Sequence, residues 1–428
     1  MNNLKTVTVV GLGKIGLPLA AVFANNGFEV IGVDINEEVV RHVNQGKSHL
    51  LNEPGIDQLV KDAYKKNSLK ATTNTAQAVR KSDVVVVIVP VLIDENDQVD
   101  YQYIDRAVLE IARGIQKGTL VIFETTVPTG DTRNRFGKKI EEISGLKMGV
   151  DFYLAYSPER VYSNRILQDL KNYPKIVGGI NKESLELAAT FYKKALNGSV
   201  INVKNLETAE FAKVAESVYR DVNIALANEL AMFADQHNVN ILDVIQAGNS
   251  QPFCHLHHPG VGVGGHCIPV YPYFFINRGL KEGLITKARE INDQMAKYAV
   301  DVIEEEVGSL ENQNILILGL AFRENVKETT KSSTLLLIEN FKQKKANVFV
   351  HDPLFTDKEI ASFGVIPISV DHQIVKTIDV VVLQAYHDRY KHLTFDPFTN
   401  CKLVFDGRNV LPREQIESLG IRYKGVGL

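Results

Sequence analysis

A cysteine in a glycine-rich stretch is the residue of this sequence best suited to covalent chemistry. The segment from Gly260 to Phe274 reads GVGVGGHCIPVYPYF, so Cys267 directly follows His266 and a run of glycines. Thiolate sulfur is a strong nucleophile, and cysteine and histidine are also the ligands that zinc prefers. Cys267 is therefore a candidate nucleophile, a candidate metal ligand or a buried thiol in a loop.

The zinc interpretation depends on the number of ligand-type side chains around Cys267. Their spacings match no standard zinc finger or ribbon, and a glycine-rich loop fixes ligand geometry poorly. We therefore predict no metal site and expect His266 to be a neighbour of the sulfur. The side chains concerned are Cys254, His255, His257, His258, His266 and Cys267.

A second chemical pattern lies near the N-terminus, where G-x-G-x-x-G directly follows the apolar run TVTVV. Such a turn lets a pyrophosphate approach the backbone at a helix N-terminus. Asp34 closes the next apolar run, and its carboxylate can accept hydrogen bonds from both ribose hydroxyls while repelling a 2′-phosphate. The pattern predicts NAD rather than NADP. The expected cofactor residues here are Gly11, Gly13, Lys14, Ile15, Gly16 and Asp34.

These groups require elements that hold them at the ends of strands. Apolar runs such as Val84–Pro90 and Leu120–Phe123 do not alternate with polar residues, which is typical of strands covered on both faces. Helical patterns such as Asp105–Lys117 separate them, so the N-terminal part is a doubly wound parallel sheet. From residue 313 a second strand–turn–helix–strand unit ends at Asp352 and echoes the first, with Arg323 placed just after its first strand.

Between the two α/β parts lies a helical pattern from Leu206 to about Gln236 without proline or glycine. Its polar residues form one stripe, which is either a salt-bridge row or the wall of a polar pocket. The helix is more apolar than a one-sided surface helix requires, which predicts a homodimer or higher homo-oligomer. The chain is thus expected to comprise a Rossmann domain over 1–195, a helical dimerisation domain over 196–300 and a Rossmann-like domain over 301–428. The stripe consists of Glu210, Lys213, Ser217 and Arg220.

Composition excludes several classes of protein. The chain has 428 residues, a formal net charge of -3 and three cysteines, which indicates neither a nucleic-acid partner nor a disulfide framework. No stretch approaches the roughly 20 apolar residues of a membrane helix. We expect a cytoplasmic protein with no membrane partner.

Taken together, the motifs resemble those of the UDP-glucose/GDP-mannose dehydrogenase family over essentially the whole chain. They occur in the family's order as FETTVPTGDT, AYSPERVY, AEFAKVAES, GVGGHCIP and DGRN. Within the family, SPERV, YRDVNIALANELA and GVGGHCIPV look most like the branch that oxidises UDP-N-acetylhexosamines. The resemblance implies two Rossmann-like domains joined by a long-helix dimerisation region, and an enzyme that uses NAD.

The resemblance also implies a four-electron oxidation of a sugar C6 hydroxyl to a carboxylate. Cys267 would trap the aldehyde as a thiohemiacetal, which a second NAD oxidises to a thioester. Lys213 would stabilise oxyanions or act as an acid and base, Glu159 would assist water, and Thr126 would hold a water near the cofactor. Lys331 stands near where an arginine usually meets NAD. The implied substrate contacts are Arg160, Val161, Lys213, Ser217, Arg220, Gly264, Phe322, Arg323 and Arg408, the last of them from a neighbouring subunit.

The sequence departs from the family pattern at several positions. Tyr271 stands where the family commonly has aspartate, so the thioester must be hydrolysed without that carboxylate. Ser217 replaces an asparagine, Phe253 stands where an arginine is frequent, and Val91 replaces a threonine. These changes concern substrate identity and hydrolysis more than the use of NAD.

Several functions remain open from the sequence. The expected substrate is either UDP-N-acetylglucosamine or UDP-N-acetylmannosamine, oxidised for surface-polysaccharide precursors, and the sequence does not decide between the two; UDP-glucose is the alternative. A two-electron hydroxyacid-type dehydrogenase or a non-catalytic Rossmann binder would also fit part of the pattern. The number of NADH released per substrate separates these classes. The four-electron enzyme predicts two, the two-electron dehydrogenase one and the non-catalytic binder none.

Overall fold

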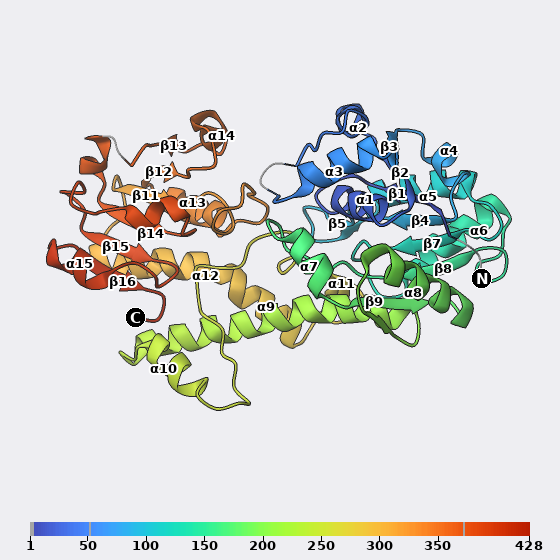
Figure 1. Ribbon diagram of the computed structural model, residues 1–428. Helices are drawn as coiled ribbons and strands as arrows, with labels where there is room; N and C mark the ends of the chain where they lie inside the picture. Colours follow the sequence, from blue (N-terminus) through green and yellow to red (C-terminus); the bar gives the residue numbers. More distant parts are fainter. Residues whose placement is uncertain (1–3, 51–52, 371–372) are drawn as a thin grey trace. The chain divides into compact units, whose positions relative to one another are not determined.

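The computed structural model describes residues 4–50, 53–370 and 373–428, which form an α/β protein (Figure 1). The chain divides into two compact units, Met1–Glu216 and Ser217–Leu428. The boundary falls inside one long helix, α9 (Leu206–Gln236), which matches the helix expected from the sequence. The predicted class of two Rossmann-like α/β domains with a long-helix segment is confirmed, whereas the division at residues 195 and 300 stays a prediction.

The N-terminal unit is built on a sheet of order β10-β9-β8-β7-β4-β1-β2-β3. Its strands are β1 (Thr6–Val10), β2 (Glu29–Val33), β3 (Leu69–Thr72), β4 (Val84–Val87), β7 (Leu120–Phe123), β8 (Tyr153–Tyr156), β9 (Lys175–Gly179) and β10 (Val200–Asn202), and β5 (Leu92–Ile93) pairs separately with β6 (Val99–Asp100). Its helices are α1 (Gly16–Asn25), α2 (Glu37–Asn44), α3 (Ile56–Lys65), α4 (Thr75–Val79), α5 (Gln102–Gly114), the π-helical η1 (Thr132–Gly137), α6 (Lys138–Ser144), α7 (Ile166–Asn172) and α8 (Lys182–Leu196).

The central strands of this sheet are fully buried, as their unbroken apolar runs predict. Every residue of β4 and β7 is 0% exposed. One pairing differs from the expected parallel sheet: β9 runs antiparallel to β8, and β10 then pairs parallel with β9. Buried strands look alike in sequence whichever direction they run, so the reversal could not be predicted.

Helix α5 occupies Gln102–Gly114 rather than the predicted 105–117. The helix ends at Gly114, where a side chain is excluded because a Cβ would lie 2.3 Å from the Ala76 carbonyl oxygen. The chain then leaves the helix at Ile115 in an extended conformation. A close approach between α4 and the end of α5 thus requires glycine at the last residue of the helix.

The C-terminal unit has a sheet of order β13-β12-β11-β14-β15-β16, in which the described neighbours all pair parallel. Its strands are β11 (Asn314–Leu318), β12 (Asn347–His351), β13 (Ile366–Pro367), β14 (Val380–Leu383), β15 (Leu403–Asp406) and β16 (Arg422–Gly425). Its helices after α9 are α10 (Ile241–Gly248), α11 (Tyr273–Ile276), α12 (Leu284–Val307), α13 (Ser333–Gln343), α14 (Asp357–Ala361) and α15 (Arg413–Ser418), with 3-10 turns η2 (Gln373–Thr377) and η3 (Asp388–His392).

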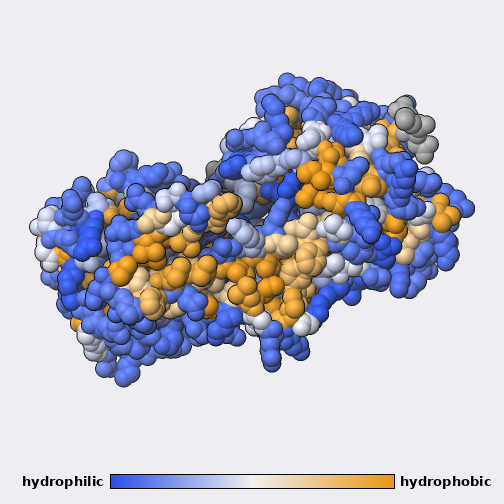
Figure 2. Space-filling model, turned by 90° about the horizontal axis from the view of Figure 1, so that it is seen from below, coloured by the Kyte–Doolittle hydropathy of each residue, from blue (hydrophilic) through white to orange (hydrophobic). Residues whose placement is uncertain are grey.

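Helix α9 carries two different faces. The polar stripe predicted from the sequence is turned inward, with Glu210 and Ser217 buried and Lys213 and Arg220 half-buried. The opposite face exposes large apolar side chains at intervals of seven or eight residues, and Figure 2 shows hydrophobic atoms gathered over this helix. We call these four residues the α9 apolar stripe. They are Phe211, Tyr219, Leu226 and Phe233.

Candidate active site

The glycine turn after β1 has the shape that a dinucleotide requires. Gly11 has φ +95°, and a Cβ at Gly16 would lie 1.8 Å from the Gly11 carbonyl oxygen, so both positions need glycine. A Cβ at Gly13 would meet no atom within 4 Å, which leaves open space beside the backbone for a phosphate. Asp34 is half-buried at the end of β2, and its Oδ2 accepts a hydrogen bond from the Leu12 amide at 2.9 Å. The turn, including exposed Lys14 and half-buried Ile15, fits NAD.

The C-terminal unit repeats this turn but closes it. Gly319 has φ +102°, and a Cβ there would lie 2.6 Å from Ala385. Asp352, at the position equivalent to Asp34, is only 2% exposed. Its oxygens accept the amides of three residues at 2.8 to 2.9 Å, so the carboxylate is buried and held by the backbone. The three amides belong to Leu320, Ala321 and Leu354.

His387 completes the enclosure of Asp352. Its Nδ1 accepts the Asn325 amide at 2.9 Å, so Nε2 carries the proton and donates to Asp352 at 3.0 Å. Burial by itself would raise the pKa of Asp352, but the bond from His387 and the backbone amides outweigh burial and lower it. This carboxylate therefore stays ionised for a structural purpose and is not available to a ribose.

Three charged side chains form a buried chain at the carboxyl ends of β7 and β8. Glu124 directly follows β7 and is 1% exposed, and Lys175 opens β9 and is 5% exposed. The Lys175 Nζ lies 2.7 Å from Glu124 Oε2 and 2.7 Å from Oε2 of Glu159, which follows β8. The Tyr192 hydroxyl donates to the other oxygen of Glu124. Lys175 thus holds the Glu159 carboxylate from one side.

Burial dominates the electrostatics of this chain. It raises the pKa of Glu124 to about 7, against the opposing effect of Lys175. Burial lowers the pKa of Lys175, but the two carboxylates outweigh it, so the pKa is raised and the ammonium stays charged. A single cation shared by two carboxylates leaves Glu124 as the one that binds a proton near neutral pH.

The sequence did not single out Glu124, Lys175 or Tyr192. The charged residue that opens the apolar run KIVGG was a signal, because lysine is almost never fully buried without a partner. Its partners, however, lie 51 and 16 residues away in the sequence.

The other predicted residues of the N-terminal unit have varied surroundings. Thr126 is buried in the loop after β7. Arg160 is engaged by an ion pair with Glu216 at 3.0 Å and a bond to the Pro174 carbonyl. Val161 packs partly against the apolar core, which gives its side chain a structural role.

In the C-terminal unit, the loop that carries Cys267 is held against the segment after β11. A Cβ at Gly264 would lie 2.6 Å from the Phe322 Cβ and 2.8 Å from the Lys331 carbonyl oxygen. The Gly265 amide donates to Thr330 at 2.8 Å. Three predicted residues, Gly264, Phe322 and Lys331, are thus brought together next to the cysteine. Arg323 turns its guanidinium toward the Phe322 ring, 5.8 Å from the centroid.

The Cys267 thiol has two polar neighbours. It is half-buried and donates to the Tyr271 hydroxyl at 3.8 Å. His266 hydrogen-bonds Cys267 and places Nδ1 2.8 Å from Oε1 of Glu328. Within residues 4–50, 53–370 and 373–428, no three histidine, cysteine or acidic side chains converge as metal ligands do. His266 is thus paired with a thiol and a carboxylate.

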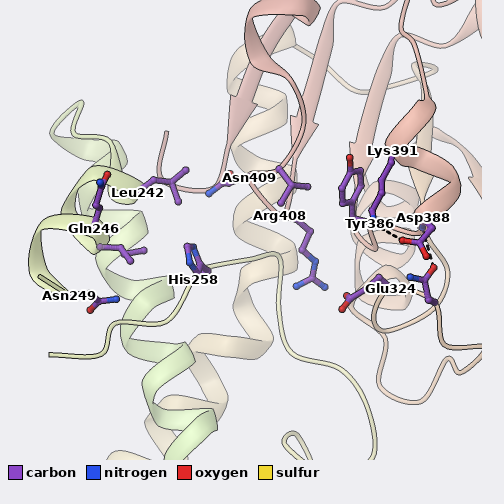
Figure 3. A pocket seen from close by; sticks show the side chains of 13 residues that line it. Leu242, Gln246, Asn249, His258, Glu324, Tyr386, Asp388, Lys391, Arg408 and Asn409 are labelled. Carbon is purple, nitrogen blue, oxygen red and sulfur yellow. Dashed lines mark hydrogen bonds and ion pairs between the residues drawn. The ribbon is translucent and has the colours of Figure 1, made fainter. Parts of the chain in front are cut away.

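Arg408 lines a cavity of about 870 Å³ in the C-terminal unit (Figure 3). Its Nε donates to the Gln384 carbonyl, and burial lowers its pKa. The cavity is also lined by His258, by Glu324 and by the ion pair of Lys391 with Asp388. Cys267 is not among its lining residues.

Comparisons with known proteins cover nearly the whole chain. The family models for the UDP-glucose/GDP-mannose dehydrogenase NAD binding, central and UDP binding domains match residues 5–196, 207–294 and 316–413. The chain belongs to the UDP-glucose/GDP-mannose dehydrogenase family. The expectations of an NAD-dependent nucleotide-sugar dehydrogenase and of NAD as the cofactor are therefore confirmed.

Individual members of this family are similar over their full length. UDP-N-acetyl-D-mannosamine dehydrogenase of Pyrococcus horikoshii is 33% identical over 98% of this chain and 99% of that protein. Its structure superimposes with a TM-score of 0.88 over 99% of each chain. NDP-N-acetyl-D-galactosaminuronic acid dehydrogenase of Ralstonia nicotianae is 33% identical over 97% of this chain and 98% of that protein. In the described residues of the present chain, no helix is both long and apolar enough to cross a bilayer.

Proposed function

We propose that this dehydrogenase oxidises the C6 hydroxyl of a UDP-N-acetylhexosamine to the carboxylate, with two NAD reduced per sugar. The observation that carries the proposal is the half-buried thiol of Cys267 in a glycine loop. A simple alcohol dehydrogenation needs no nucleophile, whereas oxidation through to the acid needs the aldehyde to be held. Bound NAD supplies the hydride acceptor at the turn formed by Gly11 to Gly16.

The residues of this chain have a distinct task in each step. Lys213 takes the hydroxyl proton as hydride leaves C6, and Cys267 adds to the resulting aldehyde carbon to form a thiohemiacetal. Loss of a second hydride from C6, together with the proton of the thiohemiacetal hydroxyl, leaves a thioester on the sulfur. Glu159 takes a proton from water as the water oxygen adds to the thioester, and the thiol then leaves to release the acid. Thr126 positions a water near the cofactor.

Support for Glu159 as the base comes from its surroundings. The Lys175 ammonium fixes one carboxylate oxygen at 2.7 Å, and the Glu159 side chain keeps 13% of its surface exposed. The other oxygen accepts the Arg160 amide at 2.7 Å, so both oxygens are held, and the exposed edge of this oriented carboxylate can receive a proton from water. Glu159→Gln should therefore retain hydride transfer but accumulate an acyl adduct on Cys267, visible by intact-mass spectrometry after addition of substrate and NAD.

The sugar is proposed from the relatives together with the sequence. Several similar proteins are named UDP-N-acetyl-D-mannosamine dehydrogenase, and another is named for an N-acetylgalactosaminuronic acid. We therefore propose UDP-N-acetylmannosamine as the first candidate, UDP-N-acetylglucosamine as the second and UDP-glucose as the alternative. The proposed contacts are Arg160, Val161, Lys213, Ser217, Arg220, Gly264, Phe322, Arg323 and Arg408, with Lys331 at the cofactor.

The experiment that tests the function is NADH release measured with these three nucleotide sugars. We expect two NADH per sugar consumed and an acidic product with one of the hexosamines. Cys267→Ala should yield no carboxylate, because its aldehyde is not trapped. One NADH per sugar would replace the proposal by a two-electron dehydrogenase, and no turnover with any of the three would contradict it. The cytoplasmic location and the role in polysaccharide precursors remain predictions.

A further inference from the structure

The neighbours of Cys267 form a chain of three groups that the family comparison does not explain. The Nδ1 atom of the His266 imidazole lies 2.8 Å from Oε1 of Glu328, and the same side chain hydrogen-bonds the thiol of the next residue, Cys267. All three residues lie in the C-terminal unit, on two loops that the backbone holds together. The order thiol, imidazole, carboxylate is that of an activated cysteine nucleophile.

We infer that His266 is a catalytic residue that takes the proton of Cys267, and that Glu328 is a positioning residue that orients the imidazole. In this step the S–H bond breaks, its electron pair stays on sulfur, and the proton moves to a ring nitrogen. The products are a thiolate and an imidazolium, so no oxidant or further reactant is needed. This inference rests on the proposed role of Cys267 as the nucleophile and deepens it.

The backbone places these groups with little freedom. The Gly265 amide, one residue before His266, donates to Thr330, and the Glu328 amide and carbonyl are bonded to Val326 and Phe322. Two glycines pack against the Phe322 side chain with no room for a Cβ. The two loops therefore keep His266 and Glu328 in register without help from the other unit.

Neighbouring charge favours the imidazolium in this position, against the opposing effect of burial. The Glu328 side chain is 13% exposed, so its charge is poorly screened. Hydrogen bonding to Cys267, and then to Glu328, raises the pKa of His266 to about 10. Thiol and imidazole titrate as a coupled pair, so ionisation belongs to the pair rather than to either residue.

Tyr271 is the competing explanation for a reactive thiol. It stands where the family commonly has aspartate, and its hydroxyl lies 3.8 Å from the sulfur. A neutral phenol has no basic lone pair that could receive the thiol proton, whereas a neutral imidazole has one on its unprotonated ring nitrogen. The hydroxyl can only stabilise the thiolate by donating a hydrogen bond, which makes it secondary to the His266 pair.

The test is the pH dependence of alkylation in the full-length protein. Iodoacetamide is applied from pH 5 to 10, and the modified peptide carrying Cys267 is quantified by mass spectrometry. Cys254 in the same sample serves as the reference thiol. We expect Cys267 to react with a midpoint below the value of about 8.5 of an ordinary cysteine. His266→Gln should slow its alkylation at pH 6.5 about tenfold or more and shift the midpoint upward, with Glu328→Gln causing a smaller shift the same way.

Two outcomes in the variants overturn the inference. One is an unchanged Cys267 profile in His266→Gln, and the other is a larger shift in Tyr271→Phe than in His266→Gln. Melting temperature and NAD binding of each variant establish that it is folded. Alkylation needs no sugar, so the profile is readable even if no nucleotide sugar is oxidised. Conversely, normal uronate formation with an ordinary Cys267 profile refutes this inference alone.

Discussion

At the scale of single residues, the main feature of the proposed hydrolytic site is a buried lysine, Lys175, that forms ion pairs with two carboxylates. A lone lysine inside the protein would cost several kcal/mol, but two carboxylates offset this cost for Lys175. The ion pair with Lys175 fixes the orientation of the Glu159 carboxylate. We therefore treat Lys175 and Glu124 as positioning residues for Glu159.

Replacing Lys175 by Met should separate positioning from binding. The variant leaves Glu124 and Glu159 without their shared cation, so kcat should fall at least about tenfold, while KM for the nucleotide sugar changes little. Adducts on Cys267 should accumulate as in Glu159→Gln. Lys182→Met is the matched control, because Lys182 is an exposed lysine of the same unit. An equal loss of kcat in the control would refute the role.

A pH prediction concerns Glu210, which is fully buried and bonds the Gly130 and Thr132 amides before η1. Burial, the largest effect, raises its pKa to about 7, above the unfolded value of 4.5. The folded protein therefore binds a proton that the unfolded chain releases, and this contribution to stability disappears as pH rises through 7. The melting temperature of the wild type should fall more from pH 5 to 8 than that of Glu210→Gln. Parallel pH profiles would contradict the assignment.

How much of the site the sequence could predict depends on where its partners lie. Cys267, Glu159 and Asp34 could be found because each sits in a local sequence motif, the last two shortly after a strand and Cys267 in a glycine-rich loop. Lys175 and Glu328 could not, because their functions depend on contacts with residues 16 to 62 positions away. A motif identifies the reacting group, whereas the group that orients it is determined by the fold.

At the scale of elements, the strands were predictable and their directions were not. Unbroken apolar runs located β4 and β7, and the absence of proline and glycine located α9. The antiparallel pairing of β9 with β8 and the close approach of Gly114 to Ala76 involve residues that are distant in sequence, so no local pattern marks them. Local pattern therefore decides which segments form elements, and packing decides their ends and their neighbours.

The α9 apolar stripe gives a prediction about assembly. We propose that it packs against the same stripe of a second copy, because four large apolar side chains on one face are costly to leave in water. Sedimentation should give a mass of at least twice the chain's 47.6 kDa. Phe233→Asp should lower that mass, whereas Gln236→Asp, on the same helix outside the stripe, should not. A monomeric wild type would contradict the proposal.

At the scale of the whole molecule, one chain contains two versions of the same turn with different uses. Asp34 stays half-buried beside an open glycine, and Asp352 is enclosed by amides and His387. The repeated pattern in the sequence predicted both units, but only the structure distinguishes the open turn from the closed one.

This difference predicts how many cofactors bind. Calorimetric titration should give one NAD per chain. Asp34→Asn should weaken NAD binding about tenfold, because a charged acceptor for the ribose hydroxyls is lost. It should also reduce the preference for NAD over NADP, because the carboxylate that repels a 2′-phosphate is gone. Asp352→Asn should leave NAD affinity unchanged while lowering the melting temperature. Two NAD per chain, or a weaker affinity in Asp352→Asn, would contradict the assignment.

The closed turn also has a consequence for the order of events in the proposed reaction. If each chain has a single NAD site, the first NADH must dissociate and a second NAD must bind before the half-oxidised sugar can be oxidised again. The half-oxidised sugar therefore has to stay bound while NADH is exchanged for NAD, and a covalent bond to the Cys267 sulfur keeps it in place. Because Asp352 has a structural role in the C-terminal unit, only the N-terminal turn is left to bind NAD. The second oxidation therefore depends on a covalent intermediate at Cys267.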